Sequence, residues 1–191
     1  MLKEDFLVEL GTEELPPKAL LKLSKSFQTG IIEGLKKESL AHGEVKSFAT
    51  PRRLAVLVCA LDEKQADRTT QKFGPAVKAA FDTHGNPTRA ADGFAKSCGV
   101  LVADLGRAPK DGVEKLSFSS TLPGKSTNEL LPAIVDAALA KLPIPKKMRW
   151  GSSRDEFVRP VHWLVMLFGE EVVPSTIMGV ESGADSFGHR F

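Results

Sequence analysis

The chain has 191 residues, of which 42% are hydrophobic and 26% are charged. This composition predicts a folded chain of one large domain or two small ones, and it excludes an intrinsically disordered protein. The formal net charge of +2 is too small by itself to indicate a nucleic-acid-binding protein, so the placement of the charges matters more than their sum.

The cysteine pattern and the lengths of the apolar runs indicate the cellular compartment of the protein. Cys59 and Cys98 show neither CxxC spacing nor a Cys/His ligand pattern, so neither a disulfide framework nor a metal site is predicted. The first ten residues lack the segments of a signal peptide. No run approaches the roughly 18 apolar residues of a membrane span. Because reduced cysteines are typical of the cytosol, we expect a cytoplasmic protein without membrane contact.

The first third of the chain predicts a strand followed by a helix. Phe6–Leu10 is apolar enough for a strand, and Pro16 and Pro17 suit the first turn of a helix. Gly30 and Gly34 within that helix are expected to allow close packing against a sheet. The apolar positions of the helix recur at helical spacing and form its buried stripe: Leu20, Leu23, Phe27, Ile31 and Leu35.

A β-hairpin is predicted next. The apolar segments 45–49 and 54–60 have strand character, and the turn Thr50-Pro51-Arg52-Arg53 joins them. The charged segment 62–72 that follows is expected to be a solvent-exposed loop.

The middle of the chain predicts a small helical insertion at 76–112. Residues 76–81 suit a single helical turn. Thr88 can cap the N-terminus of a short helix and Gly99 can end it. Residues 100–105 resemble a second short helix, so that the two would form a helical hairpin.

The next part predicts a strand and a second amphipathic helix. Residues 113–122 alternate between apolar and polar, and apolar positions recur at helical spacing between Leu130 and Leu142. Ser126–Glu129 resembles a capping box, but Pro132 would then lie inside the helix. One of these two signals is expected to yield, with regular helix from Glu129 onward.

Residues 161–168 form the most apolar run and predict a central strand that is buried on both faces. Strands and helices do not alternate as regular βαβ units, so the predicted class is α+β. We expect a mixed, mainly antiparallel sheet packed by two longer amphipathic helices. The predicted domains are an α+β segment at 1–75, the insertion at 76–112, and a continuation of the same sheet at 113–191.

Cationic side chains are concentrated in two places. From Lys141 to Pro160 there are six Lys and Arg residues against two carboxylates, and two arginines follow the turn at Thr50. Guanidinium groups match phosphates bidentately, and a tryptophan can stack on an unpaired base. Solvated charges and salt bridges within the chain are the alternative interpretation. The predicted RNA-contacting residues are Arg52, Arg53, Lys146, Lys147, Arg149, Trp150, Arg154 and Arg159.

No catalytic motif is present. The sequence lacks a Walker-type loop, a GxGxxG turn, a GxSxG elbow and an HExxH helix. His162 lies between apolar residues and is expected to be a core or edge histidine, which disfavours a hydrolase built on it or on His189. The carboxylates of Glu9, Glu13 and Glu14 are expected to stabilise the N-terminus of the first helix through its dipole and by capping. We therefore predict no catalytic residue in this chain.

Six segments carry distinctive motifs. In order they are Phe6–Pro17 (FLVELGTEELPP), Thr50–Val56 (TPRRLAV), Gly85–Gly99 (with GNPT, GFA and CG), Leu139–Gly151 (LAKLPIPKKMRWG), Phe157–Trp163 (FVRPVHW) and Gly188–Phe191 (GHRF). Together they resemble the beta subunit of bacterial tetrameric glycyl-tRNA synthetase, in the same order and over nearly the whole chain.

This resemblance implies an α2β2 glycine–tRNA ligase whose alpha subunit holds the catalytic core, and whose beta subunit binds tRNA and is needed for activity. ATP and Mg²⁺ would serve the reaction of the holoenzyme, with no cofactor in this chain. The implied partners are the alpha subunit and tRNA(Gly). Because beta chains of the family are several times longer, residues 1–191 are expected to be an N-terminal fragment that is inactive alone. A scaffold for subunit assembly without RNA contact is the alternative.

Overall fold

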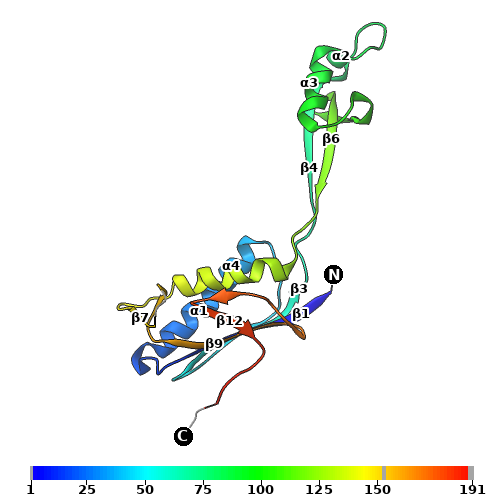
Figure 1. Cartoon of the computed structure of the whole chain (residues 1–191). Helices are drawn as coiled ribbons and strands as arrows, with labels where there is room; N and C mark the ends of the chain where they lie inside the picture. The colour runs from blue at the N-terminus through cyan, green and yellow to red at the C-terminus, as the bar shows by residue number, and fades with distance from the viewer. Residues whose placement is uncertain (1, 152–153, 189–191) are drawn as a thin grey trace. The chain divides into compact units, whose positions relative to one another are not determined.

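The computed structural model describes residues 2–151 and 154–188 of the chain. The chain divides into two compact units: unit 1 comprises Met1–Ala66 and Gly124–Phe191, and unit 2 comprises Asp67–Pro123. Figure 1 shows the helices and strands of both units with their labels. None of the helices in the described part of the chain is both long and apolar enough to cross a membrane.

Unit 1 is built on a seven-stranded sheet with the order β11-β12-β9-β1-β3-β2, in which β10 also pairs with β9. Its strand pairs are antiparallel except for β12 with β9. A separate two-stranded ribbon joins β7 to β8. The helices are α1 (Pro17–Lys37) and α4 (Thr127–Ala140). The strands are β1 (Lys3–Thr12), β2 (Val45–Thr50), β3 (Arg53–Asp62), β7 (Met148–Arg149), β8 (Glu156–Phe157), β9 (Val161–Phe168), β10 (Glu171–Val172), β11 (Thr176–Ile177) and β12 (Val180–Gly183).

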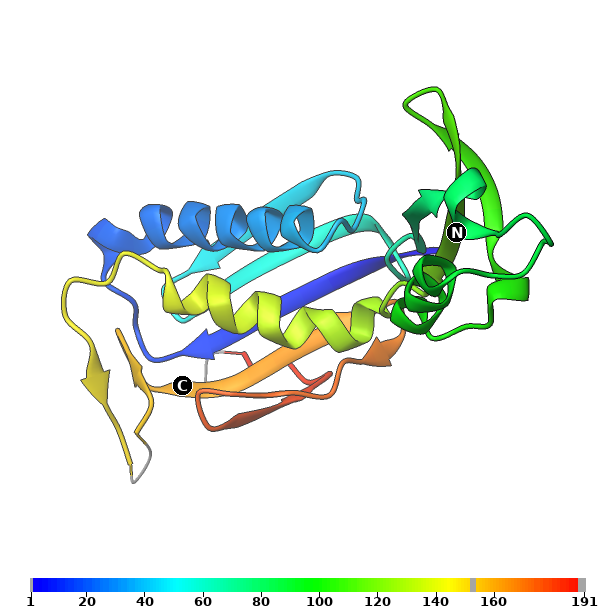
Figure 2. The same ribbon diagram turned by 90° about the horizontal axis from the view of Figure 1, so that it is seen from above.

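The two helices lie side by side over one face of this sheet (Figure 2). Their close approach depends on Gly30 and Gly34 of α1. A Cβ on Gly30 would lie 2.9 Å from the Cβ of Ala138, and one on Gly34 would lie 2.5 Å from the Cγ2 of Ile134. The expectation that these glycines pack against a sheet was therefore wrong. They pack against α4, which must also bury its own apolar stripe.

The core of unit 1 fills the space between the helices and the sheet. Phe6, Val8 and Leu10 of β1 and Phe27 and Ile31 of α1 are all 0% exposed. Burying a large apolar side chain contributes about 1.5–3 kcal/mol, so the alternation of β1 and the helical stripe of α1 fix how the two layers face each other. The predicted α+β class, with a mainly antiparallel sheet and two longer helices, is confirmed.

The apolar strand β9 lies inside the sheet as predicted, between β1 and β12. Leu164, Met166 and Phe168 are buried in the core. His162 is exposed and Trp163 is half-buried, whereas Val165 on the face away from the helices is 2% exposed, so the expectation that both faces are hidden holds in the middle of the strand and fails at its start. The helices cover one face of the sheet, and alternate side chains of β9 point to the other.

Helix α4 keeps both of the signals that seemed to conflict. The Oγ of Ser126 accepts a hydrogen bond from the backbone N–H of Glu129 at 3.4 Å, and the helix runs from Thr127 through Pro132. The expectation that one signal would yield was wrong. The hydrogen bond that Pro132 cannot donate is a cost, and it is offset by the burial of Leu131 and Val135 in the core.

Unit 2 is a three-stranded antiparallel sheet of order β4-β6-β5 with short helices. The small apolar cluster of Ala80, Ala91 and Leu116 joins the helices to the sheet. The elements are β4 (Arg68–Ala76), α2 (Val77–Ala80), α3 (Arg89–Cys98), η1 (Val102–Asp104, a 3-10 turn), β5 (Gly106–Lys110) and β6 (Val113–Leu122).

Several expectations about this part of the chain differ from the structure. The segment expected to be a loop at 62–72 contains the start of β4, and the strand at 113–122 pairs with β4 and β5 instead of continuing the main sheet. Unit 2 consequently begins at Asp67 and ends at Pro123, whereas the insertion was predicted at 76–112. Residues 100–105 hold only the 3-10 turn.

The two chain segments that connect unit 1 to unit 2 are hydrogen-bonded to each other. The backbone N–H of Gln65 donates to the carbonyl of Lys125 at 2.9 Å, and the N–H of Thr127 donates to the carbonyl of Glu63 at 2.8 Å. Gly124 is needed here, since a Cβ would lie 1.9 Å from the carbonyl oxygen of Gln65. Unit 1 therefore holds both ends of the inserted segment together.

Asp82 organises the turn between α2 and α3. Its Oδ1 accepts from the backbone N–H groups of His84 and Asn86, each at 2.8 Å, and its Oδ2 accepts from the Asn86 side chain at 3.2 Å. The bond from the backbone of Asn86 is the largest of the effects that lower the pKa of the Asp82 carboxyl below its ordinary value of 3.8. Hydrogen bonds to the ionised carboxylate stabilise that form relative to the protonated one, which lowers the pKa.

We therefore expect the turn to be stable at neutral pH and to loosen as the pH falls through the lowered pKa of Asp82. Carboxyl carbon NMR should titrate below 3.8, together with the amide signals of His84 and Asn86. Asn86→Ala should raise the pKa of Asp82 part of the way, because the two backbone bonds remain. A carboxyl that titrates at its ordinary value would contradict this account.

Candidate functional site: a pocket at the end of β1

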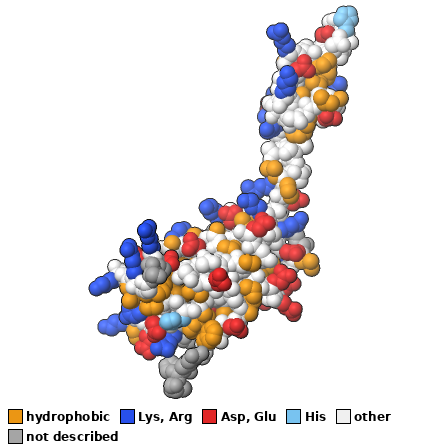
Figure 3. Space-filling model, viewed as in Figure 1, with side chains coloured by type: hydrophobic (Ala, Val, Ile, Leu, Met, Phe, Trp, Pro, Cys, Tyr) orange, Lys and Arg blue, Asp and Glu red, His pale blue; other side chains and the backbone are white. Residues whose placement is uncertain are grey.

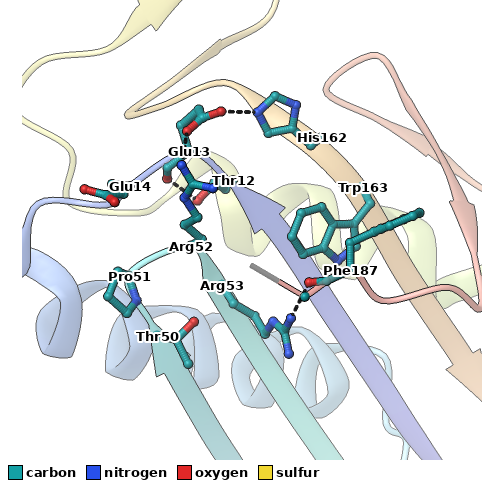
Figure 4. Close-up of a pocket in the computed structure, with 11 residues that line it drawn as sticks. Thr12, Glu13, Glu14, Thr50, Pro51, Arg52, Arg53, His162, Trp163 and Phe187 are labelled. Carbon is teal, nitrogen blue, oxygen red and sulfur yellow. Dashed lines mark hydrogen bonds and ion pairs between the residues drawn. The ribbon is translucent and has the colours of Figure 1, made fainter. Parts of the chain in front are cut away.

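A pocket of about 460 Å³ lies where β1 ends. It forms because β1 pairs with β3 on one side and with β9 on the other, so that Gly11 is opposite both Arg53 and Trp163. Figure 4 shows its side chains. We call it the Glu13 pocket. Its lining residues are Thr12, Glu13, Glu14, Thr50, Pro51, Arg52, Arg53, His162, Trp163, Phe187 and Gly188.

Glu13 joins two strands across the pocket. Its Oε2 accepts a charged hydrogen bond from the Nη2 of Arg52 at 3.1 Å, and its Oε1 lies 2.9 Å from the Nε2 of His162 (Figure 4). The backbone is fixed as well, because the N–H of Thr12 donates to Arg52 and that of Glu13 donates to Pro160. Glu13 is therefore held in place by the turn before β3 and by the start of β9 and the residue before it, and it does not cap α1, so its predicted role at that helix was wrong.

Glu9 forms a second, more deeply buried carboxylate centre beside the pocket. It is 8% exposed. Its Oε1 accepts from the indole N–H of Trp163 at 2.8 Å and from the hydroxyl of Ser186 at 2.6 Å. Its Oε2 is 3.5 Å from the Nε of Arg53, whose Nη2 donates to the carbonyl of Phe187 at 2.7 Å. The predicted helix-terminal role of Glu9 was also wrong, because its partners are on β3, β9 and the segment after β12.

Two aromatic rings form the apolar part of the pocket. The Trp163 ring lies directly on the backbone of Gly11, where a Cβ would come within 2.0 Å of it. The Phe187 ring meets Trp163 edge to face, with centroids 5.4 Å apart and an interplanar angle of 63°. Arg53 lies over the indole, 5.9 Å from its centroid. Trp163 is thus fixed on one side, whereas Phe187 remains 46% exposed.

The two arginines that were predicted to contact RNA both lie in this pocket. Arg52 is paired with Glu13 through its Nη2 and Arg53 with Glu9 through its Nε, so part of each guanidinium is already bound within the chain. The Nε of Arg52 is nevertheless buried without a hydrogen-bond partner among the described residues. Their contact with RNA stays a prediction, and the structure restricts the atoms that could make it.

Three of the other predicted residues, Lys146, Lys147 and Arg159, line a second hollow, which we call the proline groove. It has a volume of about 550 Å³ and lies between the start of α1 and the segment before β7. Lys146 and Lys147 line it and are exposed. Figure 3 shows Lys and Arg side chains gathered over this end of unit 1. The lining residues are Pro16, Ala19, Leu23, Pro143, Ile144, Pro145, Lys146, Lys147, Met148, Val158 and Arg159.

The remaining predicted residues have different environments. The Nε of Arg149 donates to Glu156 at 2.7 Å across the β7–β8 ribbon, and Trp150 is half-buried against the core. Arg154 is exposed. Arg159 donates from its Nε to the carbonyl of Glu14 at 3.0 Å. Because Arg159 lines the proline groove and Glu14 lines the Glu13 pocket, this bond connects the two hollows.

Sequence reasoning missed the residues that complete the Glu13 pocket. His162 is hydrogen-bonded to Glu13 and exposed, in agreement with the expected core or edge histidine, but its place in a pocket was not anticipated. Phe187 was not singled out. The sequence feature that points to these residues is their position within the distinctive motifs, because four of the six motifs contribute lining residues to this one pocket. The residues His189–Phe191 of the last motif lie outside the described residues. Among the described residues, no group of three or more His, Cys, Asp or Glu side chains could hold a metal ion.

Comparison with known proteins identifies the family. Residues 6–191 match the family described as "Glycyl-tRNA synthetase beta subunit". The chain is 52% identical over its whole length to the "Glycine--tRNA ligase beta subunit" of Marinobacter nauticus, and 55% identical to that of Pseudomonas aeruginosa strain LESB58, of which it covers 28% and 27% respectively.

The chain, of mixed α+β structure, therefore belongs to the glycyl-tRNA synthetase beta-subunit family. The resemblance of the six segments is confirmed. The chain spans a little over a quarter of the length of the curated relatives that it matches.

Proposed function

We propose that this chain is the part of a glycine–tRNA ligase beta subunit that helps to bind tRNA(Gly) and to associate with the alpha subunit. It acts in the cytoplasm and has no catalytic centre of its own. The alpha subunit and the full beta subunit together carry out the ATP- and Mg²⁺-dependent glycylation. Membership in the family and the names of the relatives support this assignment.

The observation that carries the RNA-binding part is the one-signed charge of the proline groove. Three cations line it, Lys146, Lys147 and Arg159, and no carboxylate is among the described residues that do so. Arg154 is exposed on the loop that follows β7. A polyanion bound there would release condensed counterions, which is the main source of sequence-independent affinity for nucleic acids.

We expect the double variant Lys146→Ala/Lys147→Ala, in full-length beta with alpha, to weaken tRNA(Gly) binding and to flatten its salt dependence. The slope of log K against log salt should fall by about 0.7–0.9 for each phosphate that the variant no longer neutralises. Binding should be measured at several salt concentrations. Arg149→Ala should change the slope less, because Glu156 already holds that guanidinium.

Lys36→Ala/Lys37→Ala provides the matched control. These two exposed lysines are adjacent in the sequence and lie in the last turn of α1, about 20 Å along the helix from Leu23, the nearest residue of α1 that lines the groove. Their removal should leave the salt slope unchanged. If the Lys146/Lys147 variant also keeps the parental slope, the assignment of phosphate binding to these lysines is wrong.

A second candidate function, a scaffold for subunit assembly, is favoured by the rest of the groove. Its other lining residues are apolar, including Leu23, Ile144 and Met148, and such a surface suits a side chain of a partner protein. On this account the same double variant would no longer co-purify with alpha and would keep its tRNA affinity. Separate assays of glycyl-adenylate formation and of tRNA charging locate the defect in either case.

A further inference from the structure

We propose that the Glu13 pocket receives one unpaired base of the bound tRNA, with Arg52, Glu13 and His162 at the edge of the base and Phe187 and Trp163 at its face. This inference rests on the proposed function, because it requires that tRNA is bound at this end of unit 1. It assigns to Arg52 a contact with a base in place of the predicted contact with a phosphate.

The first support is the combination of polar and aromatic groups in one hollow. Single-stranded bases are recognised by stacking on aromatic or guanidinium planes and by hydrogen bonds to their edges. The pocket offers the carboxylate of Glu13, the guanidinium of Arg52 and the imidazole of His162 beside the rings of Trp163 and Phe187 (Figure 4). Its volume of about 460 Å³ lies within the range of about 300–1,000 Å³ that is typical of small-molecule sites.

The second support is the buried Nε of Arg52. Buried polar groups are almost always hydrogen-bonded, so an exception calls for a specific reason. Glu13 bonds the Nη2 of the same guanidinium at 3.1 Å, while the Nε has no acceptor among the described residues. The protein itself covers this nitrogen, so a small shift of the Arg52 side chain would be needed for an acceptor on a ligand, such as a ring nitrogen or carbonyl oxygen of a base, to satisfy it.

The third support is the charge balance. Arg52 and Arg53 are matched by Glu13 and Glu9, so the pocket suits a neutral group better than a phosphate. Two carboxylates, Glu13 and Glu14, line the pocket beside the two guanidinium groups, so a basic side chain of a protein would meet like charges as well as opposite ones, and a purely apolar one would leave the donor on Arg52 unmatched. A neutral base with both donors and acceptors fits better than either.

The fourth support is the connection to the cations of the proline groove. Arg159 belongs to that groove, and it is held beside the Glu13 pocket by its bond to the carbonyl of Glu14. A strand whose phosphates contact the groove could therefore place an adjacent base in the pocket. Phosphate contacts position a nucleic acid, and base contacts specify it.

The test uses the holoenzyme with full-length beta and tRNA(Gly), probed by reagents that modify the Watson–Crick edges of unpaired bases. The parental complex should protect one unpaired base. Phe187→Ala and, separately, Glu13→Gln should remove that protection and weaken tRNA binding about 10-fold, in line with the loss of one stacked base. The salt slope should not change in Phe187→Ala, because that substitution removes no charge.

Phe48→Ala is the matched control for the aromatic residue. Phe48 lies on β2, is 52% exposed and does not line the pocket, so its removal should leave both protection and affinity intact. Thermal unfolding of each variant shows whether it is folded. Glu13→Gln changes the side-chain shape little and provides a second variant if Phe187→Ala is unstable.

Three results would overturn the inference. Protection that persists in both pocket variants shows that the base lies elsewhere. A parental complex that binds tRNA with the expected salt slope but protects no unpaired base excludes the pocket and leaves the proposed function standing. Loss of alpha association with unchanged base reactivity assigns the pocket to a protein contact. Absence of any tRNA binding by the parental holoenzyme contradicts the proposed function itself.

Discussion

Gly11→Ala is expected to lower the free energy of unfolding of the chain by about 3 kcal/mol, at the upper end of the usual cost of overpacking. The added Cβ would come within 2.0 Å of two ring atoms of Trp163. The ring cannot easily move away, because its N–H is bonded to Glu9 at 2.8 Å and its edge meets Phe187. Urea unfolding followed by Trp fluorescence measures the change.

Gly183→Ala is the control within the same unit. Gly183 lies in β12, and a Cβ there would have no heavy atom within 4 Å, so the change should be within about 0.5 kcal/mol. If Gly11→Ala unfolds at the same urea concentration as this control, the close contact between Gly11 and Trp163 is incorrect. If Gly11→Ala is folded but destabilised, it should also perturb the Glu13 pocket, because Trp163 is one of its walls.

Glu9→Leu is expected to cost about 3 kcal/mol as well. The substitution would leave Arg53, the indole N–H of Trp163 and the hydroxyl of Ser186 without their shared acceptor. Removing one partner of a buried ion pair is costly because the other charge stays buried, and an unsatisfied buried donor adds about 1–3 kcal/mol. Because the Arg53 side chain is 33% exposed, solvent screens its charge, and the expected loss in the free energy of unfolding stays at the lower end of these ranges.

Glu9→Gln separates the charge from the hydrogen bonds. The amide oxygen can still accept from Trp163, whereas the ion pair with Arg53 is broken, so the expected cost is about 1–2 kcal/mol. Denaturant unfolding of the two variants in parallel gives both values. Equal destabilisation by Gln and Leu would mean that the ion pair dominates, and a neutral Leu variant would refute the importance of this carboxylate.

The local patterns of the sequence predicted most of the elements but not all of their neighbours. The alternation at 113–122 correctly indicated a strand, yet alternation carries no information about which strand will pair with it. Pairing with β4 depends on the segment 68–76, where several consecutive residues are exposed and polar. The first half of β4 therefore has no buried face to mark it, so hydrophobic pattern alone assigned it to a loop.

The candidate site shows a different limit. The arginines after Thr50 lie in the candidate site, but the partners in its ion pairs and hydrogen bonds are distant in the sequence: Glu13 lies 39 residues from Arg52, and Ser186 lies 177 residues from Glu9. Spacing could not show that these charges neutralise each other. The exposure of Lys146 and Lys147 was easier to anticipate, because a short segment rich in proline and lysine between two elements has little to pack against.

Because Gln65 pairs with Lys125, unit 2 is an insertion whose length and sequence can change without altering unit 1. The two ends of the interrupted chain are already joined by backbone hydrogen bonds inside unit 1, so the geometry there does not depend on what lies between them. Lengthening an insertion held at both ends changes the closure entropy only slowly. Natural variation could therefore enlarge, shrink or exchange the segment 67–123 while the sheet and the Glu13 pocket stay as they are.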